Sequence, residues 1–211
     1  VIIASVVFCS GVSYKWILGV LAVLFPLGAV FVYMLQYEMI PFLRGYQATR
    51  ILAWINPKEY SAAYWQQENS IMAIGSGQFW GKGLNNTEIA SVKNGNFLSE
   101  EQTDFIFAII GEEMGFVGAM IVIALFLLLV YECLMMAYRA KDLSGRLICT
   151  GMATLLAFQS FANIAVATAI FPNTGLPLPF VSYGVSSLLS LYIGIGVVLN
   201  VGLQRRYSNE W

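Results

Sequence analysis

The chain has 211 residues, of which 58% are hydrophobic and only 11% are charged, and its mean hydropathy is +0.71. These values exclude an ordinary soluble globular domain and indicate a membrane protein. The formal net charge of -1 provides no basic surface, so we expect no nucleic-acid partner. The sequence contains no histidine, which excludes Ser-His triads and histidine-ligated zinc here and leaves carboxylates as the strongest acid-base candidates.

Four apolar stretches approach the length of about 20 residues that a membrane-spanning helix requires. They are Trp16–Gln36, Phe105–Tyr131, Leu147–Phe171 and Ser186–Leu203. We therefore predict an all-α, polytopic transmembrane helix bundle in which residues 1–211 form a single integral membrane domain. The chain opens on Val1-Ile2-Ile3 without a methionine or a signal-peptide n-region, and we expect it to start near the end of an earlier helix of a larger protein.

The basic residues predict how the bundle is oriented in the membrane. Of the 11 lysines and arginines, six lie in three short polar segments, whereas the other five are spread over one long segment. The positive-inside rule places the short segments in the cytoplasm. The outer segments are then residues 38–103, a large extracytoplasmic loop, and residues 171–185. Any chemistry carried by these segments is expected to take place outside the cytoplasm.

Two parts of the long outer loop have distinctive patterns. Around Arg50, arginines alternate with aromatic and aliphatic residues, which fits a helix lying at the membrane interface and equally a simple aromatic-belt anchor. Farther along, Lys82 lies among four glycines: Gly75, Gly77, Gly81 and Gly83. This turn either presents its amides and its lysine to a phosphate group or forms a flexible re-entrant turn.

The segment QTDFIFAIIGEEMGFVG places carboxylates at the outer end of a membrane-length apolar run. At about 100° per residue, Asp104 shares one helix face with three glycines: Gly111, Gly115 and Gly118. The opposite face carries Ile106, Phe107, Ile110, Met114, Val117 and Ile121. Because small residues let helices approach, we expect the glycine face to be buried and the bulky face to contact lipid or a partner helix. Asp104 either points into the bundle at its outer mouth or acts with Thr103 as a helix N-cap.

Two further carboxylates lie deeper in the same run. Glu112 is at the edge of the glycine face and is expected to have an internal partner or a water molecule. Glu113 points nearer the bulky face, which requires either an unseen partner or a local distortion of the helix.

Neutral polar residues accompany the last two apolar stretches. Gln159 and Asn163 are one helical turn apart, and a stripe at i+4 spacing is formed by Ser182, Ser186, Ser190 and Gly194. With Asp104 they predict a polar cleft that opens outward, although hydrogen bonding between helices without a ligand explains each residue singly. The intervening NTGLPLPFVSYG segment contains prolines and a glycine that forbid a regular helix, so its backbone groups need partners from protein, water or ligand.

Three motifs together resemble the SEDS family (shape, elongation, division and sporulation), which includes RodA and FtsW. QTDFIFAIIGEEMGFVG is similar to the family's HTDFIFAxIGEExGFxG, and NTGLPLPFVSYGVSS is similar to GxPLPFxSYGGSS. AIGSGQFWGKG is also similar, and the three motifs occur in family order. The resemblance covers nearly the whole chain, as the C-terminal part of a ten-helix fold, and details around PNTGLPLPFVSYG and QSFANIAV lean toward FtsW.

The resemblance implies a peptidoglycan glycosyltransferase that polymerises lipid II, with undecaprenyl diphosphate-linked glycan, at the outer face of the bacterial cytoplasmic (inner) membrane. It also implies a class B penicillin-binding protein as partner, and a role in cell division or cell-shape maintenance. The family's essential aspartate matches Asp104, which would be the general base of an inverting transfer. Arg50 and Lys82, alone or with a divalent metal (Mg²⁺ or Mn²⁺), would neutralise the departing diphosphate. The other predicted substrate-binding residues are Gln66, Glu112, Asn163, Ser182 and Tyr183.

The sequence departs from the family pattern at a few positions. Gln102 stands where many members have histidine, Gln78 and Val185 stand where glycine is usual, and Asn69 replaces a common glutamine. Because Asp104 is retained, these departures cast doubt on how closely the fine adjustment of the site follows the family, and less on the reaction itself.

Two other function classes stay open at this point. One is a flippase or transporter for a lipid-linked precursor, in which Asp104, Glu112 and the broken helix would line a path. Against it, the carboxylates lie in the outer half, and the cytoplasmic half of these helices has no matching acidic residue. The other is a noncatalytic membrane scaffold, in which the bulky face only docks partner helices.

Overall fold

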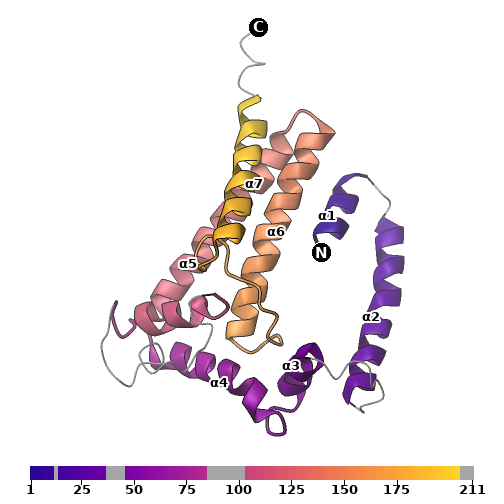
Figure 1. Cartoon of the computed structure of the whole chain (residues 1–211). Coiled ribbons are helices and arrows are strands. Elements are labelled where there is room, and N and C mark those ends of the chain that lie inside the picture. The colour runs from indigo at the N-terminus through magenta and orange to yellow at the C-terminus, as the bar shows by residue number, and fades with distance from the viewer. Residues whose placement is uncertain (12–13, 37–45, 85–102, 205–211) are drawn as a thin grey trace.

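The computed structural model describes residues 1–11, 14–36, 46–84 and 103–204. These residues form seven helices and no strand, which confirms the all-α prediction for this part of the chain (Figure 1). In chain order the helices are α1 (Ile2–Cys9), α2 (Tyr14–Gln36), α3 (Tyr46–Ile55), α4 (Ser61–Ser76), α5 (Ile106–Arg139), α6 (Leu143–Ala167) and α7 (Val185–Gln204).

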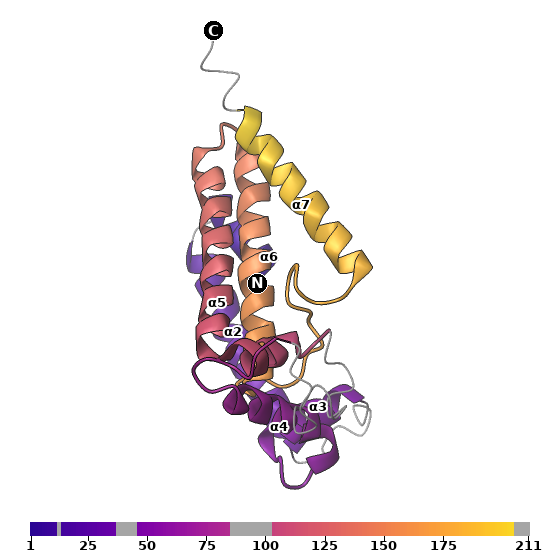
Figure 2. The same ribbon diagram turned by 90° about the vertical axis from the view of Figure 1, so that its left-hand side faces the viewer.

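Helices α5, α6 and α7 form the apolar core of the molecule. Each contains a stretch long and apolar enough to cross a membrane, as the hydropathy pattern predicted. In Figure 2, α5 and α6 run side by side, whereas α7 meets them at one end and inclines away from them toward the other. Leu156 of α6 is fully buried in the cluster that joins the three helices, together with Cys133, Cys149, Leu191 and Val198.

The ends of the spans differ from the predicted ones for physical reasons. α5 continues to Arg139, beyond the predicted end at Tyr131, because a helix does not have to stop where the apolar run is interrupted by Glu132. α6 stops at Ala167, before the predicted end at Phe171, because Ala169 adopts a left-handed backbone conformation (φ 55°) that ends the helix.

The N-terminal helices lie to one side of this core. α1 packs against α6, and its Val6 side chain lies beside Gly151. α2 agrees with the predicted span Trp16–Gln36 and continues through Pro26, but it stands apart from α5–α7 in Figure 1. Its apolar side chains, such as Phe25, are largely exposed.

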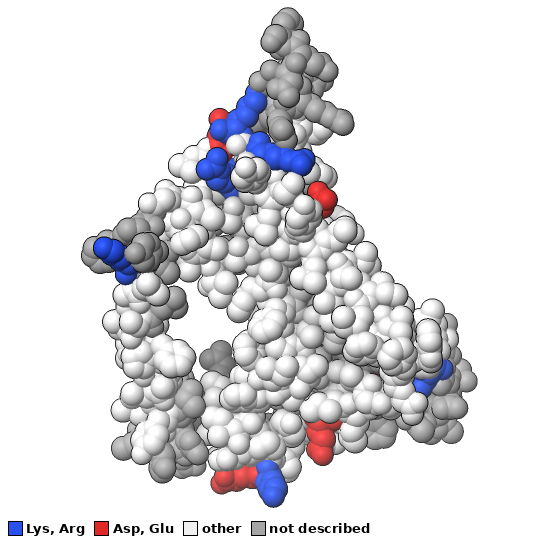
Figure 3. Space-filling view, turned by 180° about the vertical axis from the view of Figure 1, so that it is seen from behind, with Lys and Arg blue, Asp and Glu red and all other residues white. Residues whose placement is uncertain are grey.

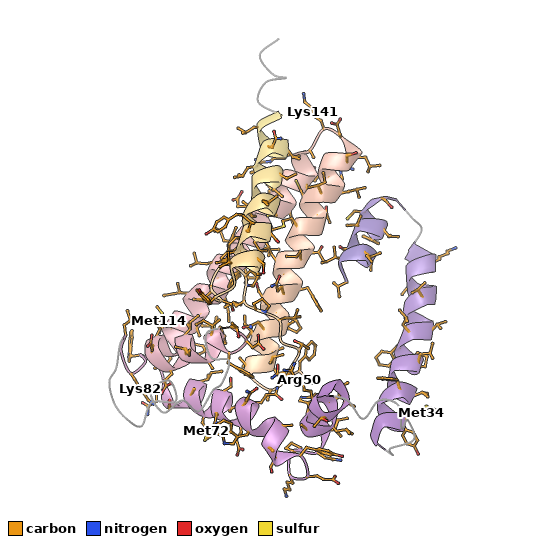
Figure 4. The ribbon with its side chains drawn as sticks, viewed as in Figure 1. Met34, Arg50, Met72, Lys82, Met114 and Lys141 are labelled. Carbon is orange, nitrogen blue, oxygen red and sulfur yellow. The ribbon has the colours of Figure 1, made fainter. Side chains whose placement is uncertain are left out.

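The two ends of the bundle differ in structure and in charge. α3 and α4 lie across the end opposite the turn that joins α5 and α6 (Figure 1). Arg50 and Lys82 lie at the α3–α4 end and Lys141 at the other (Figure 4), where the largest group of basic side chains in Figure 3 is found. The grouping of basic side chains at the end with the α5–α6 turn agrees with the predicted topology. The side of the membrane that each end faces stays a prediction.

Candidate functional site

The site begins with a break in α5. Gly115 has φ 66° and ψ -165°, so the helix is interrupted there and backbone groups on both sides of it lose their helical partners. The turn that follows α4 supplies replacements. The N–H groups of Lys82 and Gly83 donate to the carbonyls of Glu112 (2.9 Å) and Glu113 (3.0 Å), and the N–H groups of Phe116 and Val117 donate to the carbonyls of Gln78 (2.9 Å) and Phe79 (3.3 Å).

Glycine is required where these two segments meet. A Cβ atom on Gly77 would overlap the carbonyl of Gly111, and one on Gly81 would overlap the carbonyl of Glu113. A Cβ atom on Gly115 would in turn overlap the nitrogen of Gly81. The glycine-rich turn is therefore a fixed insertion into the break in α5 and not a flexible loop. The hypothesis that its amides face a phosphate is wrong for Lys82 and Gly83, whose N–H groups are used by α5.

A buried ion pair also stabilises the junction between the glycine-rich turn and the break in α5. The Lys82 Nζ atom lies 2.7 Å from Oε1 of Glu112, whose side chain is 1% exposed, while that of Lys82 is 22% exposed. The expected internal partner of Glu112 is thus confirmed, and it is the lysine that was predicted to face the diphosphate. Since a buried carboxylate needs a compensating charge, Lys82 stabilises the junction whatever else it binds. The local distortion expected near Glu113 is also present, as the break at Gly115.

The structure of α5 corrects two predictions. Phe107, assigned to the face that was expected to contact lipid or a partner helix, is only 4% exposed and belongs to the same buried cluster as Phe126 and Leu178. One helical wheel cannot hold across Gly115, and the loop that carries Leu178 covers this side of the helix. The N-cap prediction is also wrong, because the N-cap position is occupied by Phe105 and Asp104 precedes it.

Asp104 lies in a turn whose main chain is held from two sides. The Asn163 side chain donates from Nδ2 to the carbonyls of Asp104 (2.8 Å) and Leu176 (2.8 Å). The Ser182 hydroxyl donates to the carbonyl of Thr103 (2.5 Å) and accepts the N–H of Leu178 (2.7 Å). Asn163 and Ser182 are both buried. They were predicted to bind substrate, and the structure places both beside Asp104 with their donors directed at backbone.

Arg50 reaches the same place from α3. Gly175 has φ +69°, and the position that its Cβ would occupy is 3.5 Å both from Arg50 Nη1 and from Asp104 Oδ2. The guanidinium and the carboxylate are therefore separated by at most twice that distance. Gly175 is next to both groups, and a side chain there would contact both.

Asn173 organises this side of the site, a role that was not predicted from the sequence. Its carbonyl accepts from Arg50 Nη1 (3.4 Å), its Oδ1 accepts the N–H of Gly175 (3.2 Å), and its Nδ2 donates to Oε1 of Gln66 (3.4 Å). An asparagine whose side chain bonds the amide two residues later forms an Asx-turn. The Asn-Thr-Gly sequence was a signal that could have identified it.

Residues 168–184, which join α6 to α7, are called the proline-containing loop below. The rest of this loop and the end of α6 are also bonded by side chains from neighbouring helices. Trp54 donates to the carbonyl of Ala169 (2.9 Å), Gln67 to that of Phe171 (2.8 Å), and Ser70 to that of Ala167 (2.7 Å). Gln159 donates to the carbonyl of Pro177 (2.9 Å). The sequence predicted that the backbone groups of this loop need hydrogen-bond partners. Side chains of α3, α4 and α6 provide many of these partners.

Other predicted residues lie away from this centre. α7 begins at Val185, after Ser182, so the predicted serine stripe is not continuous. Ser190 is exposed and donates to the carbonyl of Ser186 within its own helix (2.8 Å). The side chain of Tyr183 is 71% exposed, and its predicted contact with substrate stays a prediction.

The described residues give no direct support for a divalent metal, and they do not test one that one or two carboxylates would hold together with substrate phosphates. They contain no group of three or more histidine, cysteine, aspartate or glutamate side chains that could hold a metal ion. The carboxylate of Asp104 faces a guanidinium instead. Participation of Mg²⁺ or Mn²⁺ therefore stays a prediction, and no step proposed below uses one.

Comparison with known proteins identifies the family. Residues 1–207 match the sequence model of the FtsW/RodA/SpoVE family, which is described as a cell cycle protein. The chain belongs to this family. It is a membrane protein, as its three apolar helices indicated.

Individual relatives agree with this assignment. Over 94% of its length, the chain is 36% identical to a probable peptidoglycan glycosyltransferase FtsW from Geobacter sp. (strain M18), of which it covers 51%. It is 37% identical, over 97% of its length, to the peptidoglycan glycosyltransferase MrdB from Escherichia coli (strain K12), of which it covers 53%.

A solved structure is also similar to this fold. It is described under the words "structural coordination of polymerization and crosslinking by a peptidoglycan synthase complex" and aligns with a TM-score of 0.68 and 30% sequence identity. The alignment covers 95% of this chain and 52% of the other. The chain thus spans about half the length of the relatives that it matches.

Proposed function

We propose that the protein is a peptidoglycan glycosyltransferase that polymerises lipid II at the outer face of the bacterial cytoplasmic membrane, in cell division or cell-shape maintenance. The names of its relatives support this class of reaction. The observation that carries the proposal is the meeting of Asp104 and Arg50 at Gly175. This meeting brings a proton acceptor, from the turn before α5, and a positive charge, from α3, together beside the loop that joins α6 and α7.

In the proposed reaction, the 4-hydroxyl oxygen of the acceptor sugar attacks the anomeric carbon of the donor. The hydroxyl proton passes to the carboxylate of Asp104, which acts as general base. The bond between the anomeric carbon and the diphosphate oxygen breaks, and the undecaprenyl diphosphate leaves with the electron pair. Attack from the side opposite the leaving group inverts the anomeric centre.

Arg50 is the cation that we assign to the leaving group. A guanidinium can donate two parallel hydrogen bonds to one phosphate, and its orientation is fixed in advance by the carbonyl of Asn173. Gln66 and Tyr183 stay candidates for contacts with the sugars. Lys82 and Glu112 contribute by holding the glycine-rich turn in the break of α5.

The same family relationship suggests a partner. The similar solved structure is described as a peptidoglycan synthase complex in which polymerisation and crosslinking are coordinated. We propose that this protein likewise acts with a crosslinking enzyme, a class B penicillin-binding protein.

The test uses the full-length protein with its partner and lipid II in detergent. Wild type is expected to form glycan strands, and Asp104→Asn, which keeps the size of the side chain, is expected to lose about 10²-fold or more of the rate. No membrane separates two compartments in detergent, so strand formation cannot arise from transport or from a scaffold alone. Near-normal strand synthesis by a folded Asn variant would remove Asp104 from the role of base.

A further inference from the structure

We infer that Asn163 is a positioning residue for Asp104: its side-chain amide joins the turn that carries the carboxylate to the proline-containing loop, and so sets where the carboxylate stands relative to the loop. The inference rests on the proposed function, because it concerns the same carboxylate. It assigns to Asn163 a contribution to the rate through Asp104, not a contact with the substrate.

The geometry of Asn163 is unusually demanding. Its side chain is 1% exposed, and both of its N–H donors are used, one on the carbonyl of Asp104 and one on the carbonyl of Leu176, each at 2.8 Å. These acceptors belong to two segments that are far apart in the sequence. A planar amide with two bonded hydrogens fixes both carbonyls relative to α6, so neither segment can shift without breaking a bond.

A second anchor acts on the neighbouring peptide. Ser182 donates to the carbonyl of Thr103 and accepts the N–H of Leu178, so two successive carbonyls before α5 are held by side chains. Because Phe105 and not Asp104 occupies the N-cap position, the helix itself does not fix the main chain at Asp104. These side-chain bonds therefore contribute to the position of the main chain that carries the carboxylate.

Gln159 provides the matched comparison within the same helix. It lies one turn from Asn163 on α6 and donates to the carbonyl of Pro177, the residue that follows Leu176. It anchors the same loop to the same helix with the same functional group. The difference is that only Asn163 also holds the carbonyl of Asp104.

The experiment compares Asn163→Leu with Gln159→Met in the full-length protein with its partner and lipid II. Both substitutions keep the approximate volume and remove the amide. We expect Asn163→Leu to lower kcat about 10- to 100-fold with little change in KM for lipid II, because displacement of about 1 Å can cost a factor of this size. Gln159→Met is expected to keep kcat within about threefold, because loosening one loop carbonyl does not release Asp104.

A double-mutant cycle separates positioning from general loosening. In an Asp104→Asn background, Asn163→Leu should add less than about threefold, because the group that it positions is already removed. Equal effects of Asn163→Leu and Gln159→Met, or a full additional loss in the Asp104→Asn background, would overturn the inference.

The outcomes also separate this inference from the function on which it rests. An inactive wild type rejects the proposed glycosyltransferase and the inference with it, whereas an active wild type with equal single variants rejects only the role of Asn163. If Asn163→Leu does not yield folded protein, Asn163→Gln is used, since it keeps the amide but displaces it by one methylene. The same drop in kcat and the same cycle are then expected.

Discussion

Replacing Gly115 by alanine should destabilise the protein through two separate effects. The backbone at Gly115 (φ 66°, ψ -165°) is in a region open almost only to glycine, and forcing another residue there costs about 1–3 kcal/mol. The new Cβ would also overlap the nitrogen of Gly81 and press on the carbonyl of Phe79, and such overpacking costs a further 1–3 kcal/mol or so. We expect a total loss of about 2–6 kcal/mol, a large part of the stability of an ordinary protein.

The assay is thermal unfolding of the full-length protein in detergent, followed by tryptophan fluorescence and by recovery of the folded peak in size-exclusion chromatography. Gly75→Ala is the control, because it lies at the end of α4, just before the same turn, and its Cβ would meet no atom within 4 Å. We expect Gly75→Ala to melt close to wild type and Gly115→Ala well below it. If Gly115→Ala melts with the control, the break in α5 and the inserted turn do not exist as described.

Two further predictions concern the charged residues. Lys82→Met should destabilise the fold by about 3 kcal/mol, because it leaves Glu112 buried without its 2.7 Å partner, and Glu112→Met added to it should restore most of that loss in the same melting assay. A double variant no more stable than Lys82→Met would show that the pair does not hold the junction. Arg50→Lys should reduce initial glycan-strand synthesis at saturating lipid II while leaving the melting temperature unchanged, because lysine keeps the charge but loses the two-pronged donor. Equal rates for lysine and arginine would leave Arg50 as an anchor at the membrane interface.

The parts of the fold that depend on composition and length could be predicted from the sequence. A run of apolar residues long enough to cross a membrane has few alternatives to a helix, so α5, α6 and α7 were found with errors only at their ends. The end of α6 was missed because it depends on the left-handed backbone of Ala169, which the surrounding loop determines. Nothing in the local sequence favours that conformation for an alanine.

The parts of the site that depend on contacts between distant segments could not be predicted. A glycine inside a helical pattern is usually tolerated, so nothing local distinguishes Gly115 as a break from Gly118 as a packing position. The break is tolerated because the turn at residues 77–83 supplies the lost hydrogen bonds. The periodicity of apolar residues in a sequence does not show which distant segments bond to each other. The helical wheel failed for Phe107 for the same reason.

The site residues show the same division. Asp104 was found through a motif, whereas its proximity to Arg50 depends on how α3 lies beside the proline-containing loop. Asn163 and Ser182 were found as polar residues in an apolar setting, but their partners could not be read from type or spacing. A buried amide that binds substrate and one that binds backbone have the same sequence signature. Only their acceptors, the carbonyls of Asp104 and Leu176, distinguish them.

Irregular backbone in a membrane protein is unfavourable unless its peptide groups find hydrogen-bond partners. The partners that they find in this structure bear on the mechanism. The break at Gly115 and the proline-containing loop both leave peptide groups without helical partners, and both receive them from other segments of the chain. A site supported in this way is rigid before any substrate arrives, because moving the loop would expose several carbonyls at once. Such rigidity suits a reaction that needs a base and a fixed charge at set positions. It is harder to reconcile with a transporter, whose path must open and close around its cargo.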